Sequence, residues 1–327
     1  MSELQLPGLG LSRSRLAVRH VLSRYGIVIA FVVLCFGLSL LNPYFLTWLN
    51  ILNVLRQASI NGILAVGQTF VILTGGIDLS VGSLLAVCGI LGASFVTGAN
   101  PGSAWTAIAV GLGAGLGLGM INGALVARLR VPPFVATLGM LSVARGLTFI
   151  ANDGMPVPHL APGFLQIGQG FIVGVPVPVM LFAAAALIAW AVLRFTTYGR
   201  YVYATGGNER SARTSGVGTR KVIFSVYAIS GALAGLSGMV LAARTTSALP
   251  QAGLSYELDA IAAVVIGGTS LTGGVGSVLG TVLGALIIAV INNGLDLTGV
   301  SSYYQQVIKG AIIVLAVLLD TSRRGRD

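Results

Sequence analysis

The chain has 327 residues, of which 55% are hydrophobic and only 9% are charged, and its formal net charge is +10. Soluble domains carry about 25% charged residues, so nineteen Lys/Arg and nine Asp/Glu are too few to cover a globule of this length with polar surface. The composition therefore argues against a soluble enzyme or a nucleic-acid-binding domain and predicts an all-α, polytopic transmembrane helix bundle.

Ten apolar runs follow one another along the chain. A helix that spans a bilayer needs about 20 mainly apolar residues, and backbone groups in lipid must form their hydrogen bonds within the segment, so these runs are predicted to be helices. The eighth run is short, which leaves open a broken or re-entrant helix at that place. The runs are 25–41, 58–74, 80–97, 104–127, 133–150, 176–194, 222–243, 257–268, 277–294 and 305–320.

The basic residues predict the orientation. No small-residue cleavage site follows the first run, so we expect an uncleaved span behind a cytoplasmic N-terminal tail, residues 1–24. The transmembrane domain then covers 25–320, and a cytoplasmic C-terminal tail covers 321–327. With both termini in the cytoplasm, fifteen of the nineteen basic residues lie inside, as the positive-inside rule expects. The exceptions are Arg56, Arg145, Arg244 and Lys309.

Glycines recur at a spacing of four within the runs, which places them on one face of a helix where a second backbone can approach closely. The run from Gly111 to Gly119 also alternates with a period of two, as a strand would, but its length and apolar flanks favour a helix. The two series are Gly111, Gly115, Gly119 and Gly123, and Gly276, Gly280 and Gly284.

A Gly-Gly-x-x-Leu-[Ser/Thr]-x-Gly phrase occurs twice, at 75–82 and 267–274, each time where one apolar run ends and the next begins. Interrupted helices at corresponding places in two halves are typical of a transport site, although a Gly-rich chain can also repeat such a phrase by chance. The predicted break residues are Gly75, Gly76, Asp78, Gly267 and Gly268. Asp78 precedes the third run, where a carboxylate can cap a helix and meet the positive end of its dipole.

Uncharged polar residues lie deep in the apolar runs and could line a route for a hydroxyl-rich solute, because amides both donate and accept hydrogen bonds. The alternative role for each is to hold neighbouring helices together. The candidates for the translocation pathway are Gln57, Asn61, Gln68, Thr69, Asn292 and Asn293. Arg145, deep in the fifth run, needs a partner, for which we consider Glu257, Asp259 or backbone carbonyls.

The sequence lacks the motifs of an energy-converting or hydrolytic enzyme. Neither lysine, Lys221 or Lys309, follows a glycine as the phosphate-binding Walker A loop requires. The two histidines, His20 and His159, are too far apart in sequence for a paired-His metal motif. We therefore expect no catalytic residues, no cofactor and no metal in this chain.

The link 195–221 is the longest predicted cytoplasmic segment between runs, and it is rich in charge. Asn208 can cap a short helix that Gly216 closes, which gives a compact element exposed to the cytoplasm. Such an element is typical of a docking site rather than of a merely solvated loop. Its candidate docking residues are Gly207, Asn208, Glu209, Ala212 and Gly216.

From about residue 53 to 320, the sequence resembles the ribose-type branch of the carbohydrate-importing ABC transporter permeases. Four long motifs in order make the likeness specific: 65–83, the 206–216 loop, 256–271, and 292–295 followed by 299–305.

The resemblance implies a non-enzymatic subunit of a bacterial inner-membrane importer for ribose or a similar monosaccharide, working as a homodimer or with a similar chain. Two cytoplasmic ATPases would dock on the Glu209–Gly216 loop within the link 195–221, which is similar to the family's coupling loop, and a periplasmic sugar-binding protein would meet outward loops such as 151–176 and 245–256. Departures from the family pattern leave the sugar and the finer docking contacts open. They are Arg210 and Ser211, where alanines are usual, Leu254-Ser255 before Tyr256, and Asp296, where Asn is common.

The competing hypothesis is a secondary transporter of a small polar solute, driven by an ion gradient. That class usually places acidic or histidine relays well inside its helices, whereas the acids of this chain cluster at the ends of runs and in loops.

Overall fold

The computed structural model describes residues 10–98 and 101–324 and contains, within them, thirteen α-helices and one two-stranded antiparallel sheet. The elements are α1 (Gly10–Leu41), α2 (Trp48–Leu73), α3 (Val81–Ala93), α4 (Ala104–Ala127), α5 (Pro133–Ile150), α6 (Pro162–Gln169), β1 (Phe171–Ile172), β2 (Val175–Pro176), α7 (Val177–Phe195), α8 (Thr197–Gly207), α9 (Glu209–Thr214), α10 (Thr219–Thr245), α11 (Tyr256–Ile266), α12 (Val278–Leu297) and α13 (Ser302–Arg324). The predicted helix bundle is confirmed.

Each of the ten apolar runs coincides with one of these helices, and α6, α8 and α9 are short additions between them. Five helices are long and apolar enough to cross a membrane, namely α4, α5, α7, α10 and α12. Residues 10–24 of the predicted N-terminal tail are helical and continue α1, and 321–324 of the C-terminal tail continue α13. The rest of both tails lies outside the described residues. Ten crossings and cytoplasmic termini stay predictions.

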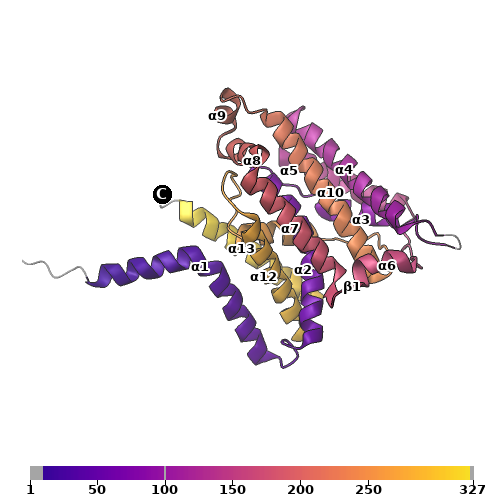
Figure 1. The fold of residues 1–327 in the computed structure, drawn as a ribbon, viewed down its shortest axis with the longest axis horizontal. Coiled ribbons are helices and arrows are strands. Elements are labelled where there is room, and N and C mark those ends of the chain that lie inside the picture. Colours follow the sequence, from indigo (N-terminus) through magenta and orange to yellow (C-terminus); the bar gives the residue numbers. More distant parts are fainter. Residues whose placement is uncertain (1–9, 99–100, 325–327) are drawn as a thin grey trace, which may run out of the picture.

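Helix α10 forms the centre of the bundle. It packs on α4 most extensively, and also on α2, α3 and α6. Figure 1 shows α4 and α5 at one edge of the molecule and α1 at the opposite edge, where α1 is bent and its first half points away from the other helices. The part of α1 that meets the bundle packs against α12.

The glycine series on α4 explains the close approach of α4 to α10. A Cβ on Gly115 would overlap the carbonyl oxygen of Gly231, and one on Gly119 would overlap that of Tyr227. Gly117, which belongs to the alternation of period two, has no atom within 4 Å of such a Cβ. The helical interpretation is therefore confirmed, since only the spacing of four faces α10.

In the second series, Gly280 and Gly284 lie on α12 and approach Gly267 and Ala263 at the α11 side. The prediction that Gly276 belongs to this stripe is wrong, because Gly276 precedes the helix and has a φ of +155°. Ser277, the residue after it, caps α12 instead by accepting a hydrogen bond from the Gly280 N–H.

Both Gly-Gly phrases interrupt the helical structure. The first separates α2 from α3, and the second separates α11 from α12. Helices α3 and α11 have 13 and 11 residues, so at about 1.5 Å per residue each is shorter than the roughly 30 Å hydrocarbon core. The short eighth run is therefore a half-length helix, α11. The first turns of α3 and α11 meet where Gly82 closely approaches Gly253 and Glu257.

Candidate functional site

A contact built almost entirely from backbone lies at the end of the bundle that carries α8 and α9. The N–H of Gly274 donates to the carbonyl oxygen of Leu73, 2.9 Å away, which joins the second break to the end of α2. A Cβ on Gly206 would overlap the same oxygen, and one on Gly273 would lie 2.8 Å from the nitrogen of Gly75. We call Gly75, Gly206, Gly273 and Gly274 the glycine junction.

The glycine junction requires glycine for two reasons. Gly75, Gly273 and Gly274 have φ angles of +78°, +87° and +75°, in the left-handed region that residues with a Cβ rarely adopt. Gly206 is helical, but it has no room for a side chain. The junction therefore ties the link 195–221 to both helix breaks with no side chain between them.

The remaining predicted break glycines have different surroundings. Gly76 faces the hydroxyl of Tyr227, and Gly267 packs against Gly280 on α12. Gly268 has a φ of +85°, and its nearest neighbour is the side chain of Ile27, at 3.8 Å from a Cβ built there.

The predicted short helix in the link is present as α9. Asn208 is its N-cap, with Oδ1 accepting from the Ser211 N–H at 2.9 Å, and Gly216 follows the helix with a φ of +88°. Ala212 is buried, whereas Glu209 is exposed. The carboxylate of Glu209 pairs with Arg213 and accepts from the hydroxyl of Thr219 at 3.1 Å, so it fastens α9 to the start of α10.

The link also contains α8, which the sequence did not predict. The hydroxyl of Tyr203 donates to the Gly276 carbonyl oxygen at 3.0 Å, and Tyr198 hydrogen-bonds Ser225 on α10. Burial raises the pKa of the Tyr203 phenol, which keeps it a protonated donor. Helix α8 is therefore bonded both to the second break and to α10.

Asp78 lies in the first break and is fully buried. Its Oδ1 accepts from the N–H of Ser80 at 3.0 Å and from the Ser80 hydroxyl at 2.6 Å, and its Oδ2 accepts from Ser230 at 3.1 Å. Gln68 donates to the Asp78 carbonyl at 2.6 Å, and Asn122 donates to Ser80. The carboxylate thus holds the residues just before α3 through neutral donors, while the N-cap position itself is Ser80, which makes no side-chain cap hydrogen bond.

A second buried carboxylate, Asp259 in the first turn of α11, lies where four helices converge. The ammonium of Lys309 on α13 is 3.1 Å from its Oδ2, and the amide of Asn61 on α2 donates to the same oxygen at 3.4 Å. The side chain of Asn292 on α12 also lies beside this carboxylate. We call Asp259, Lys309, Asn61 and Asn292 the four-helix cluster.

The four-helix cluster leaves hydrogen-bonding capacity unused. The Oδ1 atoms of Asn61 and Asn292 are buried and have no partner among the described residues. The side chain of Lys309 is 26% exposed, so the cluster reaches the molecular surface. Asn61 lies twelve residues before Leu73 in α2, about 18 Å along the helix from the glycine junction.

The other predicted pathway residues lie outside this cluster. Thr69 bonds Thr281 at 2.8 Å between α2 and α12, and Asn293 forms a reciprocal amide pair with Asn50. Gln57 is half-buried on α2, one turn before Asn61. The structure therefore brings together two of the six candidates, Asn61 and Asn292, and spreads the others.

Two charged residues of the deep runs have partners that the sequence left partly open. Arg145 donates to the carbonyl oxygens of Pro250 and Ala252, at 2.7 and 3.0 Å, so the backbone alternative is confirmed for this side chain. In the sequence, Lys309 is notable only as a basic residue outside the predicted cytoplasmic segments. Its position outside the cytoplasmic segments was the one sequence signal for a buried ion pair, but spacing along the chain could not identify Asp259 as its partner.

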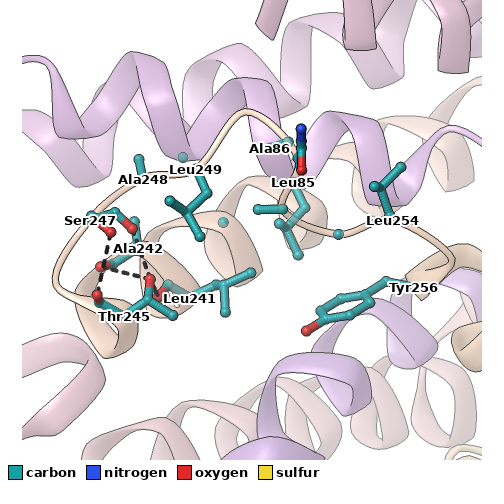
Figure 2. A pocket seen from close by; sticks show the side chains of 15 residues that line it. Leu85, Ala86, Leu241, Ala242, Thr245, Ser247, Ala248, Leu249, Leu254 and Tyr256 are labelled. Atoms are coloured by element: carbon teal, nitrogen blue, oxygen red, sulfur yellow. Dashed lines mark hydrogen bonds between the residues drawn. The ribbon is translucent and has the colours of Figure 1, made fainter. Parts of the chain in front are cut away.

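A cavity of about 260 Å³ lies between α3, α10 and the segment that joins α10 to α11. Figure 2 shows Ser247 at one end of it and Tyr256 at the other, with Leu85 and Leu249 between them. Because its walls are mainly apolar, this cavity offers a polyol few hydrogen bonds, and the four-helix cluster is the better candidate for solute contact. No group of three or more possible metal ligands occurs within the described residues.

Comparison with known proteins shows which family the chain belongs to. A family model described as "Branched-chain amino acid transport system / permease component" matches residues 50–317. The ribose import permease protein RbsC of Bacillus subtilis (strain 168) is 48% identical, over 95% of this chain and 97% of that protein. The D-allose transport system permease protein AlsC of Escherichia coli (strain K12) is 41% identical over 91% of each chain.

The L-arabinose transport system permease protein AraH of Escherichia coli (strain K12) is 34% identical, over 98% of this chain and 97% of that protein. No solved structure matches the chain significantly. The matches cover both helix breaks, the link 195–221 and the four-helix cluster. The chain therefore belongs to this family of multi-pass membrane permeases, in the ribose-type branch of the ABC transporter permeases.

Proposed function

We propose that the chain is the membrane-spanning permease subunit of a binding-protein-dependent ABC importer in the bacterial inner membrane, and that it carries ribose or a similar monosaccharide into the cytoplasm. The observation that carries this proposal is the near-full-length likeness to a ribose import permease. ATP hydrolysis belongs to partner ATPases, a periplasmic protein delivers the sugar, and the permease works as a dimer.

Within this function, the four-helix cluster contacts the sugar. Its unpartnered amide oxygens are acceptors for sugar hydroxyls, and the Lys309 ammonium has three donors, of which Asp259 uses one at 3.1 Å. Gln68 and Thr69 are buried completely, and they stabilise the interrupted helices. Asn293 holds α12 to α2 through Asn50.

The link 195–221 receives the ATPase through α9. A partner can shift the permease between inward- and outward-facing states only if it binds the two states with different affinity. The glycine junction supports such coupling, because Gly206 touches the end of α2 and the second break directly.

Replacing Glu209 with Lys should turn its attraction for Arg213 into repulsion and weaken ATPase docking while leaving the helices folded. Co-purification of the ATPase and circular dichroism would measure the two effects. Normal transport by that variant would contradict the docking role.

The function is tested by uptake of labelled ribose into proteoliposomes. We expect accumulation only when ATP, the ATPase and the binding protein are supplied together. Uptake by the chain alone, driven by an ion gradient, would instead establish the secondary transporter. Binding of sugars to the cognate periplasmic protein would identify which monosaccharide is carried.

Two adjacent asparagines separate sugar contact from helix packing. Asn292→Leu should raise the KM for sugar about tenfold, which corresponds to about 1.4 kcal/mol of lost contact, without releasing the ATPase. Asn293→Leu removes the donor to the buried Asn50 Oδ1 and should lower the stability by about 1–3 kcal/mol, with little change in KM. Equal KM values for the two variants would contradict the assignment of the four-helix cluster to the sugar.

A further inference from the structure

A second cavity, of about 460 Å³, opens at the α9 end of the bundle. Four segments enclose it: the first helix break at Thr74–Gly76, the link between α4 and α5, helix α9, and the start of α10. The ATPase docking proposed above uses α9, which forms one part of this wall, but it does not account for the arginines that the α4–α5 link and α10 contribute.

The lining of this cavity is rich in arginine. Arg130, Arg213 and Arg220 line it together with a single acid, Glu209. Glu209 pairs with Arg213, whereas Arg130 and Arg220 form no ion pair within the described part of the chain. Two positive charges are therefore left without a counter-charge, and guanidinium groups match phosphate oxygens in geometry.

The backbone at Arg130 also favours a specific role. Arg130 adopts a left-handed conformation, with a φ of +59°, between the end of α4 and the start of α5. Such a conformation is uncommon for a residue with a long side chain, and it brings the residue into the lining of the cavity.

The lining also includes apolar residues, and further apolar side chains are exposed close to them on α5. Val126, Val131 and Ile223 contribute to the wall. On α5, just beyond the wall, Phe134 and Val135 are each 56% exposed, as expected for side chains that face acyl chains. A basic pocket beside an apolar, membrane-facing flank fits a lipid better than an acidic protein segment, which would not cover the apolar side.

We propose that this cavity binds the phosphate-bearing headgroup of an anionic phospholipid, with Arg130 and Arg220 on the phosphate and the acyl chains along α5. The proposal rests on membrane location, which follows from family membership, and not on the identity of the sugar. A bound headgroup joins the α4–α5 link to α9 across the first break. It therefore fixes the segments that the ATPase has to move.

The test measures lipid retention by the purified full chain, without partners. A negative result would therefore count against the lipid site and not against the proposed transport. Native mass spectrometry in mixed micelles compares phosphatidylglycerol with phosphatidylcholine. We expect at least about tenfold stronger retention of phosphatidylglycerol, and a loss of about tenfold in that retention for Arg130→Gln and for Arg220→Gln.

Arg128→Gln is the matched control, because Arg128 has the same charge two residues before Arg130 but stacks on Phe224, 5.6 Å from the ring centroid, and does not line the cavity. It should retain phosphatidylglycerol as the unmodified chain does. Equal losses in all three variants would mean attraction by surface charge alone and would overturn the proposal. If Arg130→Gln does not fold, as size-exclusion chromatography would show, Arg220→Gln decides the question.

Two competitors identify the source of the anion. Inorganic phosphate at millimolar concentration should not displace the lipid, and displacement would indicate a site for free phosphate. A polyglutamate peptide should compete less well than a short-chain phosphatidylglycerol. If the peptide competes better, the cavity receives an acidic protein segment, and the lipid assignment is wrong.

Discussion

The glycine junction and the four-helix cluster use opposite means to join distant segments. At the junction, the backbones of α2, α8 and the second break touch directly, and side chains are excluded. In the cluster, polar side chains of α2, α11, α12 and α13 meet around the Asp259 carboxylate. Both regions include α2, so we expect a movement of that helix at one region to displace its contacts at the other.

This difference suggests a division of labour. Backbone contacts are rigid and indifferent to the solute, which suits the transmission of movement from the ATPase. Side chains with unused hydrogen-bonding atoms distinguish one solute from another. The two regions should therefore fail under different substitutions: the cluster when a polar group is lost, and the junction when any side chain is added.

The largest effect is expected from Lys309→Met. The substitution leaves the Asp259 carboxylate, which is 3% exposed, without its cation. Breaking a buried pair in this way destabilises by about 3–5 kcal/mol. Thermal unfolding in detergent should show the loss, and the double variant Asp259→Leu with Lys309→Met should recover most of it.

The exposed Lys221 provides the control, and Lys221→Met should leave the unfolding temperature unchanged. The double variant should remain deficient in sugar uptake although its stability is restored, because its carboxylate and ammonium are gone. Recovery of uptake together with stability would assign the pair to packing alone.

An intermediate effect is expected at the junction, where two neighbouring glycines differ. A Cβ on Gly206 would overlap the Leu73 carbonyl oxygen, whereas a Cβ on Gly207 would have no atom within 4 Å. Gly206→Ala should therefore destabilise by about 1–3 kcal/mol and reduce the stimulation of the ATPase by the loaded binding protein. Gly207→Ala should do neither. Equal stimulation in the two variants would remove the junction from the coupling path.

The sequence predicted the helices well because burial in lipid leaves few choices. Each apolar run became a helix, and the spacing of four at Gly115 and Gly119 correctly predicted close packing with a neighbour. The duplicated Gly-Gly phrase located both breaks. Local rules also predicted the Asn208 cap, since capping depends only on residues three positions apart.

The sites were harder to predict because their members meet through tertiary packing. Asn292 and Asn293 are adjacent in sequence, yet they face Asp259 and Asn50 on different helices. The contact of Asp259 with Lys309 joins residues fifty positions apart, and no periodicity indicates it. The helix α8 was missed because its sequence, with Gly199 and several polar residues, lacks a continuous apolar face.

The smallest effect is expected from Asn208→Ala, which tests whether α9 acts as a compact docking element joined to the junction. Loss of the Oδ1 acceptor leaves the Ser211 N–H without its cap and should weaken α9 by about 1 kcal/mol. Hydrogen exchange of the α9 amides should then accelerate about fivefold, while exchange in α2 and α11 stays the same. Asn208→Asp keeps an acceptor and should restore protection, since Asp caps as well as Asn. If exchange in α2 also accelerated, the junction would depend on α9 for its own stability, and the separation between a rigid backbone contact and a removable docking helix would be wrong.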